Sequence, residues 1–471
     1  MAKEESQSSI DALSPMFKLC TVLASFPPYS FHGKFKATGK RYKIYTLFFL
    51  VLIICISSCQ IYGRITCRLE KLMALAVKLP EDFSNIFLLV LAARTAILNY
   101  THCDELKQLL YRLELFDKAM SKNSTRRKLF LTAFTVLHLA LVVAAGFHCM
   151  AFGFTFGMEY YKCNFGKYFL IYLTSINLMM VVWMGAEIRF RFDTLNDYLL
   201  KYDYHLHETN RTADVLKRVS VHLKCVRMWH NDLCNLVEKY NDLFGISMLL
   251  FVLFDTSNVL SNTVTVLDIV TAPRESSEDY LLGYIIFVSL MCLVFSLVRT
   301  LMLALSSENL ARATERMTII CYKLLNEVPV VPETDYDTML NEKLHLIARQ
   351  GFFRKPHVSG AGFFAINLEI MGSMASWAQV VTICVISESI SQEASRTTNI
   401  CYILLNDVPA VPKSYYHKLL KDELLQTAEQ SFSRVPQISA GGFFDVNLTV
   451  VGFMLSSVAF YVIVAAELES S

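Results

Sequence analysis

Long apolar runs alternate with charged, helix-patterned segments along most of this chain. Six such runs lie before residue 306, and each is close to or longer than the about 20 residues that a membrane helix needs. They are residues 44–62, 83–100, 129–154, 166–185, 243–269 and 281–305. The charged segment 187–240 between the fourth and fifth runs also has a helical pattern. The sequence predicts an all-α membrane protein built as a bundle of transmembrane helices.

The end of the chain repeats itself with a shift of 80 residues. Residues 321–329 match 401–409, and the Gly-Phe-Phe that begins at Gly362 matches the one that begins at Gly442. Each copy has a polar, helix-prone linker followed by another apolar run, 363–386 in the first copy and 443–466 in the second. The predicted organisation is an N-terminal segment 1–43, six spans within 44–305, a first copy 306–387 and a second copy 388–471.

The positions of the basic residues predict the orientation of the spans. Lysine and arginine concentrate in the N-terminal segment and in the loops after the second, fourth and sixth spans. The positive-inside rule then places the N-terminus in the cytoplasm and makes a seventh span end outside. An eighth span would run in the opposite direction to the seventh, although the two linkers are alike. Two interpretations follow: two joined versions of one final segment, of which one occupies the seventh-helix position, or a true eight-span protein.

Composition narrows the function classes. Charged residues make up 18% of the chain and the net charge is +2, whereas an ordinary soluble domain has about 25% charged residues. A nearly neutral chain gives no indication of nucleic-acid binding. Carboxylates, histidines, serines and cysteines show no catalytic or metal-ligand spacing, so we expect no enzyme activity, no metal and no cofactor.

The end of the second copy carries a short recognisable motif. Tyr461 is followed by five apolar residues and then by Glu467 and Leu468. This resembles the last-helix signature of the insect gustatory receptor family, which reads Thr-Tyr, five apolar residues, Gln-Phe. Phe460, Glu467 and Leu468 depart from that signature, and the first copy has Val381 in place of the tyrosine.

A second stretch, His230–Leu233 followed by Asn241–Gly245, is similar to the family's entry into the fifth helix. The resemblance implies a seven-transmembrane, ligand-gated cation channel in the plasma membrane of sensory dendrites. It implies a homo- or heterotetramer with other chemoreceptor subunits, opened by a small-molecule tastant. The alternatives are an odorant-receptor-type channel, a membrane transporter, or a non-functional product of two joined terminal exons.

The resemblance also assigns pore residues by motif position. In this family the last helix of each subunit lines the pore, and rings of side chains near helix ends set gating and selectivity. Leu468 would form the hydrophobic constriction and Glu467 an acidic ring that favours cations, with Tyr461 between helices. The alternative for Glu467 is a solvated helix end.

Intramembrane charged residues are candidates for a function, because burial of a charge costs about 2.5 to 3.5 kcal/mol on insertion scales; those considered are Arg94, Asp255, Asp268 and Arg299. Arg94 and Asp255 are the deeper two, and we predict that they pair, either as a structural ion pair or beside a ligand. Asp268 and Arg299 lie nearer the span ends and are predicted to reach interfacial water.

A polar ligand would need hydroxyl partners and an aromatic face. Spans four and five offer six candidates for such a pocket: Tyr172, Asn177, Trp183, Asp255, Thr256 and Asn258. For each of them, packing or a helix–helix hydrogen bond is the alternative role.

Overall fold

The computed structural model describes most of the first 374 residues and part of the second copy. The described ranges are 14–29, 39–66, 75–120, 158–201, 213–271, 279–328, 334–362, 364–374, 398–405 and 415–433, with shorter pieces within 132–150 and 376–396. Predictions that fall elsewhere lie outside the described residues. These include residues 377–394 and 434–471, and with them the pore residues Tyr461, Glu467 and Leu468.

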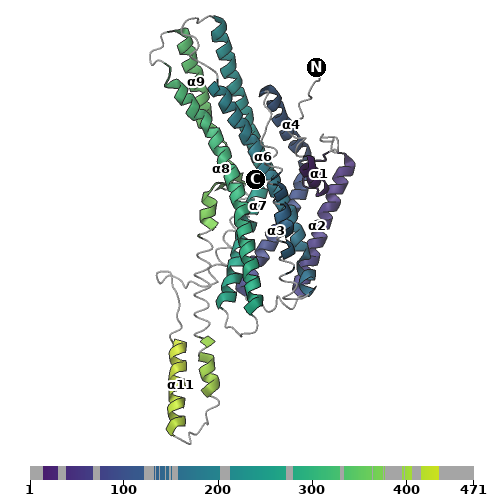
Figure 1. Cartoon of the computed structure of the whole chain (residues 1–471), viewed down its shortest axis with the longest axis vertical. Coiled ribbons are helices and arrows are strands. Elements are labelled where there is room, and N and C mark those ends of the chain that lie inside the picture. Colours follow the sequence, from purple (N-terminus) through teal and green to yellow (C-terminus); the bar gives the residue numbers. More distant parts are fainter. Residues whose placement is uncertain are drawn as a thin grey trace, which may run out of the picture. The chain divides into compact units, whose positions relative to one another are not determined.

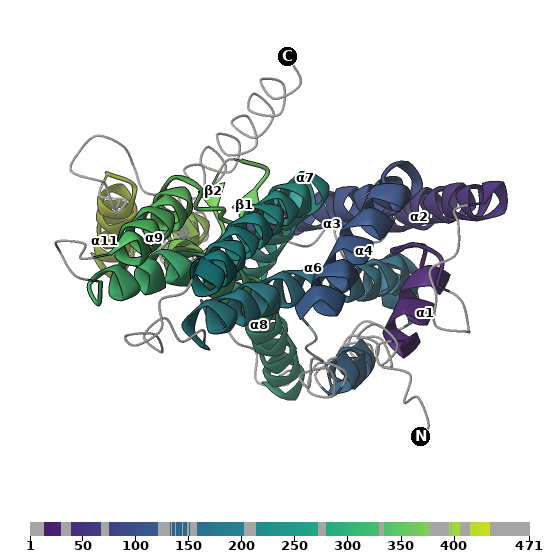
Figure 2. The ribbon, with the colours of Figure 1, turned by 90° about the horizontal axis from the view of Figure 1, so that it is seen from above.

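Helices make up almost all of the described structure (Figures 1 and 2). They are α1 (Ser14–Val22), α2 (Lys40–Thr66), α3 (Leu75–Thr101), α4 (Cys103–Met120), α6 (Met158–Lys201), α7 (Ala213–Thr271), α8 (Asp279–Leu325), α9 (Asp335–Phe353) and α11 (Tyr415–Ser433). A small antiparallel pair is formed by β1 (Ser359–Gly360) and β2 (Phe364–Ala365). The prediction of an all-α membrane fold is confirmed.

The chain divides into two compact units. The first contains Met1–Lys71, Phe83–Thr256 and Phe295–Met371, and the second contains Leu72–Asp82, Ser257–Val294 and Gly372–Ser471. Within the first unit, α2 and α4 both pack against α6. The hydroxyls of Tyr240 on α7 and Ser306 on α8 donate to the carbonyls of Val181 and Val182, at 3.1 and 3.2 Å. These bonds hold α7 and α8 to α6.

Five described helices are long and apolar enough to cross a membrane, namely Lys40–Tyr62, Glu81–Thr101, Gly166–Lys201, Leu216–Leu267 and Ile285–Leu325. They contain most of the first, second, fourth, fifth and sixth predicted spans. The apolar helix Phe134–Phe147 lies in the predicted third span and is only partly described.

Three helices are much longer than a bilayer is thick. α7 has 59 residues, which at 1.5 Å per residue makes it about 90 Å long, against a hydrocarbon core of about 30 Å. α6 and α8 have 44 and 47 residues. The charged segment 187–240 is therefore helical in its described parts, as predicted, and continues the spans beyond the membrane.

The N-terminal segment contributes to the core of the first unit. Met16, Phe17 and Cys20 on α1 are fully buried. The side-chain amide of Asn99 on α3 donates to the Ala24 carbonyl and to the Tyr42 hydroxyl, both at 2.9 Å. The six apolar runs found in the sequence do not include this helix, because nine residues give little signal beside the long spans.

The repeat is visible in the helix bounds. α9 covers Asp335–Phe353 and α11 covers Tyr415–Ser433, 80 residues later at both ends. The preceding helices end at Leu325 and at Leu405, again 80 residues apart. Cys321 and Ala348 are buried in the first copy, and their counterparts Cys401 and Ala428 are buried in the second. The two polar linkers therefore have the same local fold.

Candidate functional site

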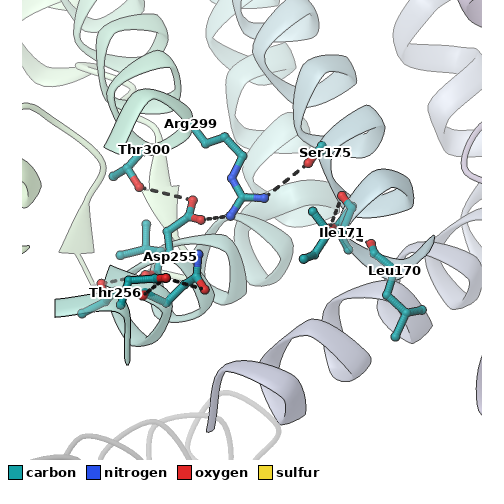
Figure 3. A network of polar contacts seen from close by, with 11 residues as sticks. Leu170, Ile171, Ser175, Asp255, Thr256, Arg299 and Thr300 are labelled. Carbon is teal, nitrogen blue, oxygen red and sulfur yellow. Dashed lines mark hydrogen bonds and ion pairs between the residues drawn. The ribbon is translucent and has the colours of Figure 1, made fainter. Parts of the chain in front are cut away.

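A buried ion pair joins three of the long helices (Figure 3). The guanidinium of Arg299 on α8 donates to Oδ1 of Asp255 on α7, and the two side chains are 2% and 1% exposed. The Thr300 hydroxyl donates to Oδ2 of Asp255 at 3.3 Å, and Arg299 Nη1 donates to the Ser175 hydroxyl on α6 at 3.3 Å. A charge at this depth is tolerated only when it is paired and hydrogen-bonded.

Aromatic rings complete the surroundings of Arg299. Its guanidinium carbon lies 4.8 Å from the ring centroid of Phe254 and 5.1 Å from that of Phe295, within the range of a cation–π contact. Within the described part of the chain, its Nε is buried and has no hydrogen-bond partner. The Nε of Arg299 is therefore a hydrogen-bond donor without an acceptor in this cluster.

The predicted pairing of Arg94 with Asp255 is wrong, because Asp255 pairs with Arg299. Arg94 lies on α3 next to Thr95, whose hydroxyl accepts a hydrogen bond from Asn177 on α6 at 2.8 Å. Within the described residues, Nε of Arg94 is buried and has no hydrogen-bond partner. Arg299 was predicted to reach interfacial water, which its burial also contradicts.

The other candidates on α6 lie at different depths. The Tyr172 hydroxyl is 3.0 Å from Nδ1 of His138, and Asn177 uses its amide on Thr95. Trp183 packs edge-on against Phe17 of α1, with ring centroids 5.3 Å apart. Eight residues separate Ser175 from Trp183, which is about 12 Å along a helix. The structure therefore does not bring Trp183 to the Asp255 cluster.

Thr256 and Asn258 follow Asp255 on α7, and both are half-buried. The Thr256 hydroxyl donates to the Val252 carbonyl at 2.7 Å. Asn258 accepts hydrogen bonds from the Asn262 amide at its carbonyl oxygen and its Oδ1, at 2.7 and 3.3 Å. Neither side chain is held by another helix through these bonds.

A second buried charge lies in the polar half of α6. Arg191 is 3% exposed, and its guanidinium donates to Asp117 on α4 at 2.5 Å and to Glu187 at 2.7 Å. Its Nε donates to the Leu113 carbonyl at 3.2 Å. Every nitrogen of this guanidinium is engaged, so the group rigidly fastens α4 to α6.

The segment that leads into the last predicted span of the first copy is fixed on α7. We call residues 354–361 the strap. Arg354 donates through its two terminal nitrogens to the side chains of Asn231, Asn235 and Glu238, at 2.5 Å for Asn235 and 2.8 Å for Glu238. The Asn241 amide donates to the His357 carbonyl at 2.7 Å.

Backbone contacts extend the strap along the same side of α7. The Ser359 N–H donates to Oδ1 of Asn241 at 3.3 Å. A Cβ added at Gly245 would lie 3.0 Å from the Ala361 nitrogen. The α7 positions 231, 235, 238, 241 and 245 are three or four residues apart and so form one stripe. The stretches His230–Leu233 and Asn241–Gly245 entered the sequence prediction only through the family resemblance. The helical spacing of Asn231, Asn235, Glu238 and Asn241 is the sequence signal of this docking face.

The long helices and their buried ion pair define a multi-span helical membrane protein. A family model described as 7tm chemosensory receptor matches residues 13–378. Because this match covers more than half of the chain, the protein belongs to the 7tm chemosensory receptor family, a class of receptors and not of enzymes. The match ends before the second copy of the repeat begins. No curated protein matches the sequence.

A solved structure supports the same fold. It is the insect olfactory receptor OR5 from Machilis hrabei in complex with eugenol. The likeness has a TM-score of 0.51 and 12% sequence identity, and it covers 80% of this chain and 98% of that chain. At this identity the likeness concerns the fold.

Proposed function

We propose that this protein is a gustatory receptor: a cation channel that a small-molecule tastant opens directly. The observation that carries the proposal is the family match over residues 13–378, together with the fold shared with an insect olfactory receptor. The gustatory branch is favoured over the odorant branch by Tyr461, the five apolar residues after it, and the position of Glu467 and Leu468.

The strap supports a channel mechanism. It is tied to α7 by Arg354 and Asn241 and leads directly into the apolar run that begins at Phe363. A movement of α7 would therefore be transmitted to the start of that run. In the proposed tetramer, four such runs surround the pore, and the polar halves of α6, α7 and α8 lie in the cytoplasm. The proposed location is the plasma membrane of sensory dendrites.

Ligand recognition is proposed at the cluster of Asp255, Arg299 and Ser175, with Thr256 beside it. The olfactory receptor in the comparison is in complex with eugenol, which supports a small-molecule ligand for this fold. The Nε of Arg299 offers a buried donor, and Phe254 and Phe295 offer aromatic faces. An oxygen of the ligand would accept the hydrogen bond from Arg299.

The variant Arg299→Lys tests this recognition, because it keeps the positive charge beside Asp255 and removes Nε. We expect the half-maximal tastant concentration to rise at least about tenfold, a loss typical of one buried hydrogen bond to a charged group. Arg312→Lys is the matched control, since Arg312 pairs with Glu308 on the exposed side of α8. If the half-maximal concentration is unchanged at equal surface expression, the cluster has a structural role only and does not bind the tastant.

Whole-cell current tests the channel itself. Three chains are compared with G-protein signalling blocked: the full chain, a chain ended at Ser389, and a chain without residues 308–387. A tastant panel is applied to each after surface expression is confirmed. Current that persists under the block supports a channel, whereas a response that the block abolishes contradicts it. An electrogenic transporter would instead show coupled substrate uptake without unitary openings.

A further inference from the structure

We propose that the second copy can replace the first on the strap-binding face of α7. The chain would then assemble in two alternative forms, with either α9 and the strap or α11 and residues 434–441 docked on α7. This inference concerns which segment docks, and it stands whether or not the protein conducts ions.

The residues that bind α7 recur in the second copy. Arg354 supplies the strap's side-chain bonds to α7, and Arg434 stands 80 residues later. The Ser359 hydroxyl accepts from the Gly362 N–H at 3.3 Å, and Ser439 and Gly442 occupy the same places. The Asn241 bonds use strap backbone atoms only, which any sequence supplies. The second copy therefore has, at the matching positions, the residue types that make these contacts in the first copy.

The helices of the two copies differ in what covers them. Leu340 and Leu344 on α9 are 5% and 1% exposed. Their counterparts on α11 are Leu420, which is 49% exposed, and Leu424, which is half-buried. α9 lies on α7 and α8, since Gln350 donates to the Arg227 carbonyl at 3.4 Å and Gly351 lies against Thr318. α11 thus keeps leucines at positions that in α9 are covered by tertiary packing.

Three substitutions decide which copy fits better. A Cβ at Gly351 would lie 2.4 Å from Oγ1 of Thr318, and the second copy has Ser431 there. The first copy also has a capping box between Thr334 and Asp337. The second copy has His417 at the position of Asp337, and histidine does not complete this capping box. The third difference favours the second copy. Ala361 has a φ of 52°, and the second copy has Gly441 at this position, which adopts that conformation without strain.

The first copy is therefore favoured on α7 and is the one docked in this structure. Each strap leads into its own Gly-Phe-Phe and apolar run, 363–386 or 443–466. Docking would consequently select which run becomes the last membrane span, and the selection is made during membrane insertion and assembly. This arrangement removes the need for one linker to lie on each side of the membrane.

Cysteine cross-linking of the full chain in lipid nanodiscs tests the exchange. Asp242→Cys, next to the strap-binding Asn241, is combined with His357→Cys to report the first copy or with Gln437→Cys to report the second. A short bis-maleimide joins each pair, and mass spectrometry of the monomer band identifies the linked peptides. Chains with only one of the introduced cysteines control for reaction with native cysteines.

Arg354→Ala should lower the 242–357 cross-link and raise the 242–437 cross-link at least threefold. Lys355→Ala is the matched control, because among the described residues Lys355 pairs with Glu315, which lies on α8 and not on α7. Adding Arg434→Ala should reverse the rise. A 242–357 cross-link that falls without a rise in 242–437 would overturn the proposal.

A deletion keeps the test decisive if Arg354→Ala changes neither cross-link. The chain without residues 308–387 contains only the second copy, and it should form the 242–437 cross-link to the level that 242–357 reaches in the full chain. Aggregation of this chain, or a monodisperse chain without the cross-link, would show that the second copy does not fit α7 and would overturn the proposal.

Discussion

Asp255 on α7 and Arg299 on α8 form an ion pair that is almost completely removed from solvent, with exposures of 1% and 2%. Both carboxylate oxygens of Asp255 are used, one by Arg299 and one by Thr300. Because Arg299 also reaches Ser175 on α6, three helices depend on one pair of charges. The pair is therefore expected to matter for assembly of the bundle whether or not a ligand contacts it.

Removing one partner should be costly. Asp255→Ala leaves Arg299 buried without its counter-charge, and breaking a buried pair in this way costs about 3–5 kcal/mol. We expect a lower thermal midpoint in detergent and several-fold less protein at the cell surface. The double variant Asp255→Leu with Arg299→Leu should recover most of the midpoint. Glu308→Ala, which breaks an exposed pair on α8, should change it little, and equal effects of Asp255→Ala and Glu308→Ala would contradict this account.

Gly245→Ala should weaken the strap. In an exposed helix, alanine is more stable than glycine by about 1 kcal/mol, yet here its Cβ would lie 3.0 Å from the Ala361 nitrogen and 3.2 Å from its Cα. We expect a lower thermal midpoint and faster proteolysis near residue 361. Gly283→Ala on α8 is the matched control, because a Cβ there meets nothing within 4 Å. If both variants raise the midpoint alike, the strap does not contact α7 closely.

Glu105 should add a small pH-dependent part to stability. A hydrogen bond with His102 at 2.8 Å, aided by Lys239 on α7, lowers the pKa of Glu105 below its ordinary value of 4.5. A lowered carboxyl pKa stabilises the folded state above the ordinary value, and this stabilisation is lost as the pH falls through the lowered one. The effect is small because Glu105 is 45% exposed.

The thermal midpoint of Glu105→Gln should therefore depend less on pH than that of the unmodified chain between pH 5 and pH 3. Glu114→Gln, on the same helix and paired with Lys118 only four residues away, serves as the control. A pH dependence that is identical in all three proteins would show that the contact with His102 and Lys239 does not couple to folding.

The proposed pore residues make separate predictions. Glu467→Gln removes an acidic ring and should lower calcium permeability relative to sodium several-fold, because such a ring concentrates divalent cations. Leu468→Ala widens the constriction and should give current without tastant. Reversal potentials in bi-ionic solutions and basal current measure these changes in the chain without residues 308–387. If selectivity and gating are unchanged in both variants, Glu467 and Leu468 do not line the pore.

Sequence patterns predicted the elements more reliably than their contacts. The apolar runs at 44–62 and 281–305 are long enough to be recognised alone, and the structure confirms helices there. The shift of 80 residues predicted two like linkers, and the bounds of α9 and α11 agree with it. These features depend on composition and periodicity within one segment, which a single sequence records directly.

The partner of Asp255 could not be predicted in the same way. Arg94 and Arg299 are both arginines within apolar runs, and the choice between them depends on how α3 and α8 are rotated toward α7. The strap was missed for a related reason, since Arg354 contacts residues more than 100 positions earlier in the chain. Pairings across helices are set by packing of the whole bundle, and no local period encodes them.

Single-channel recording from the purified chain is the most direct test of tastant-gated conduction. The protein is reconstituted alone in a planar bilayer and exposed to a tastant that evokes current in cells expressing it. We expect unitary cation currents whose open probability rises with the tastant. The contrary result is correctly inserted protein that gives no current with that tastant, although cells expressing it respond. That result would mean that another protein carries the current.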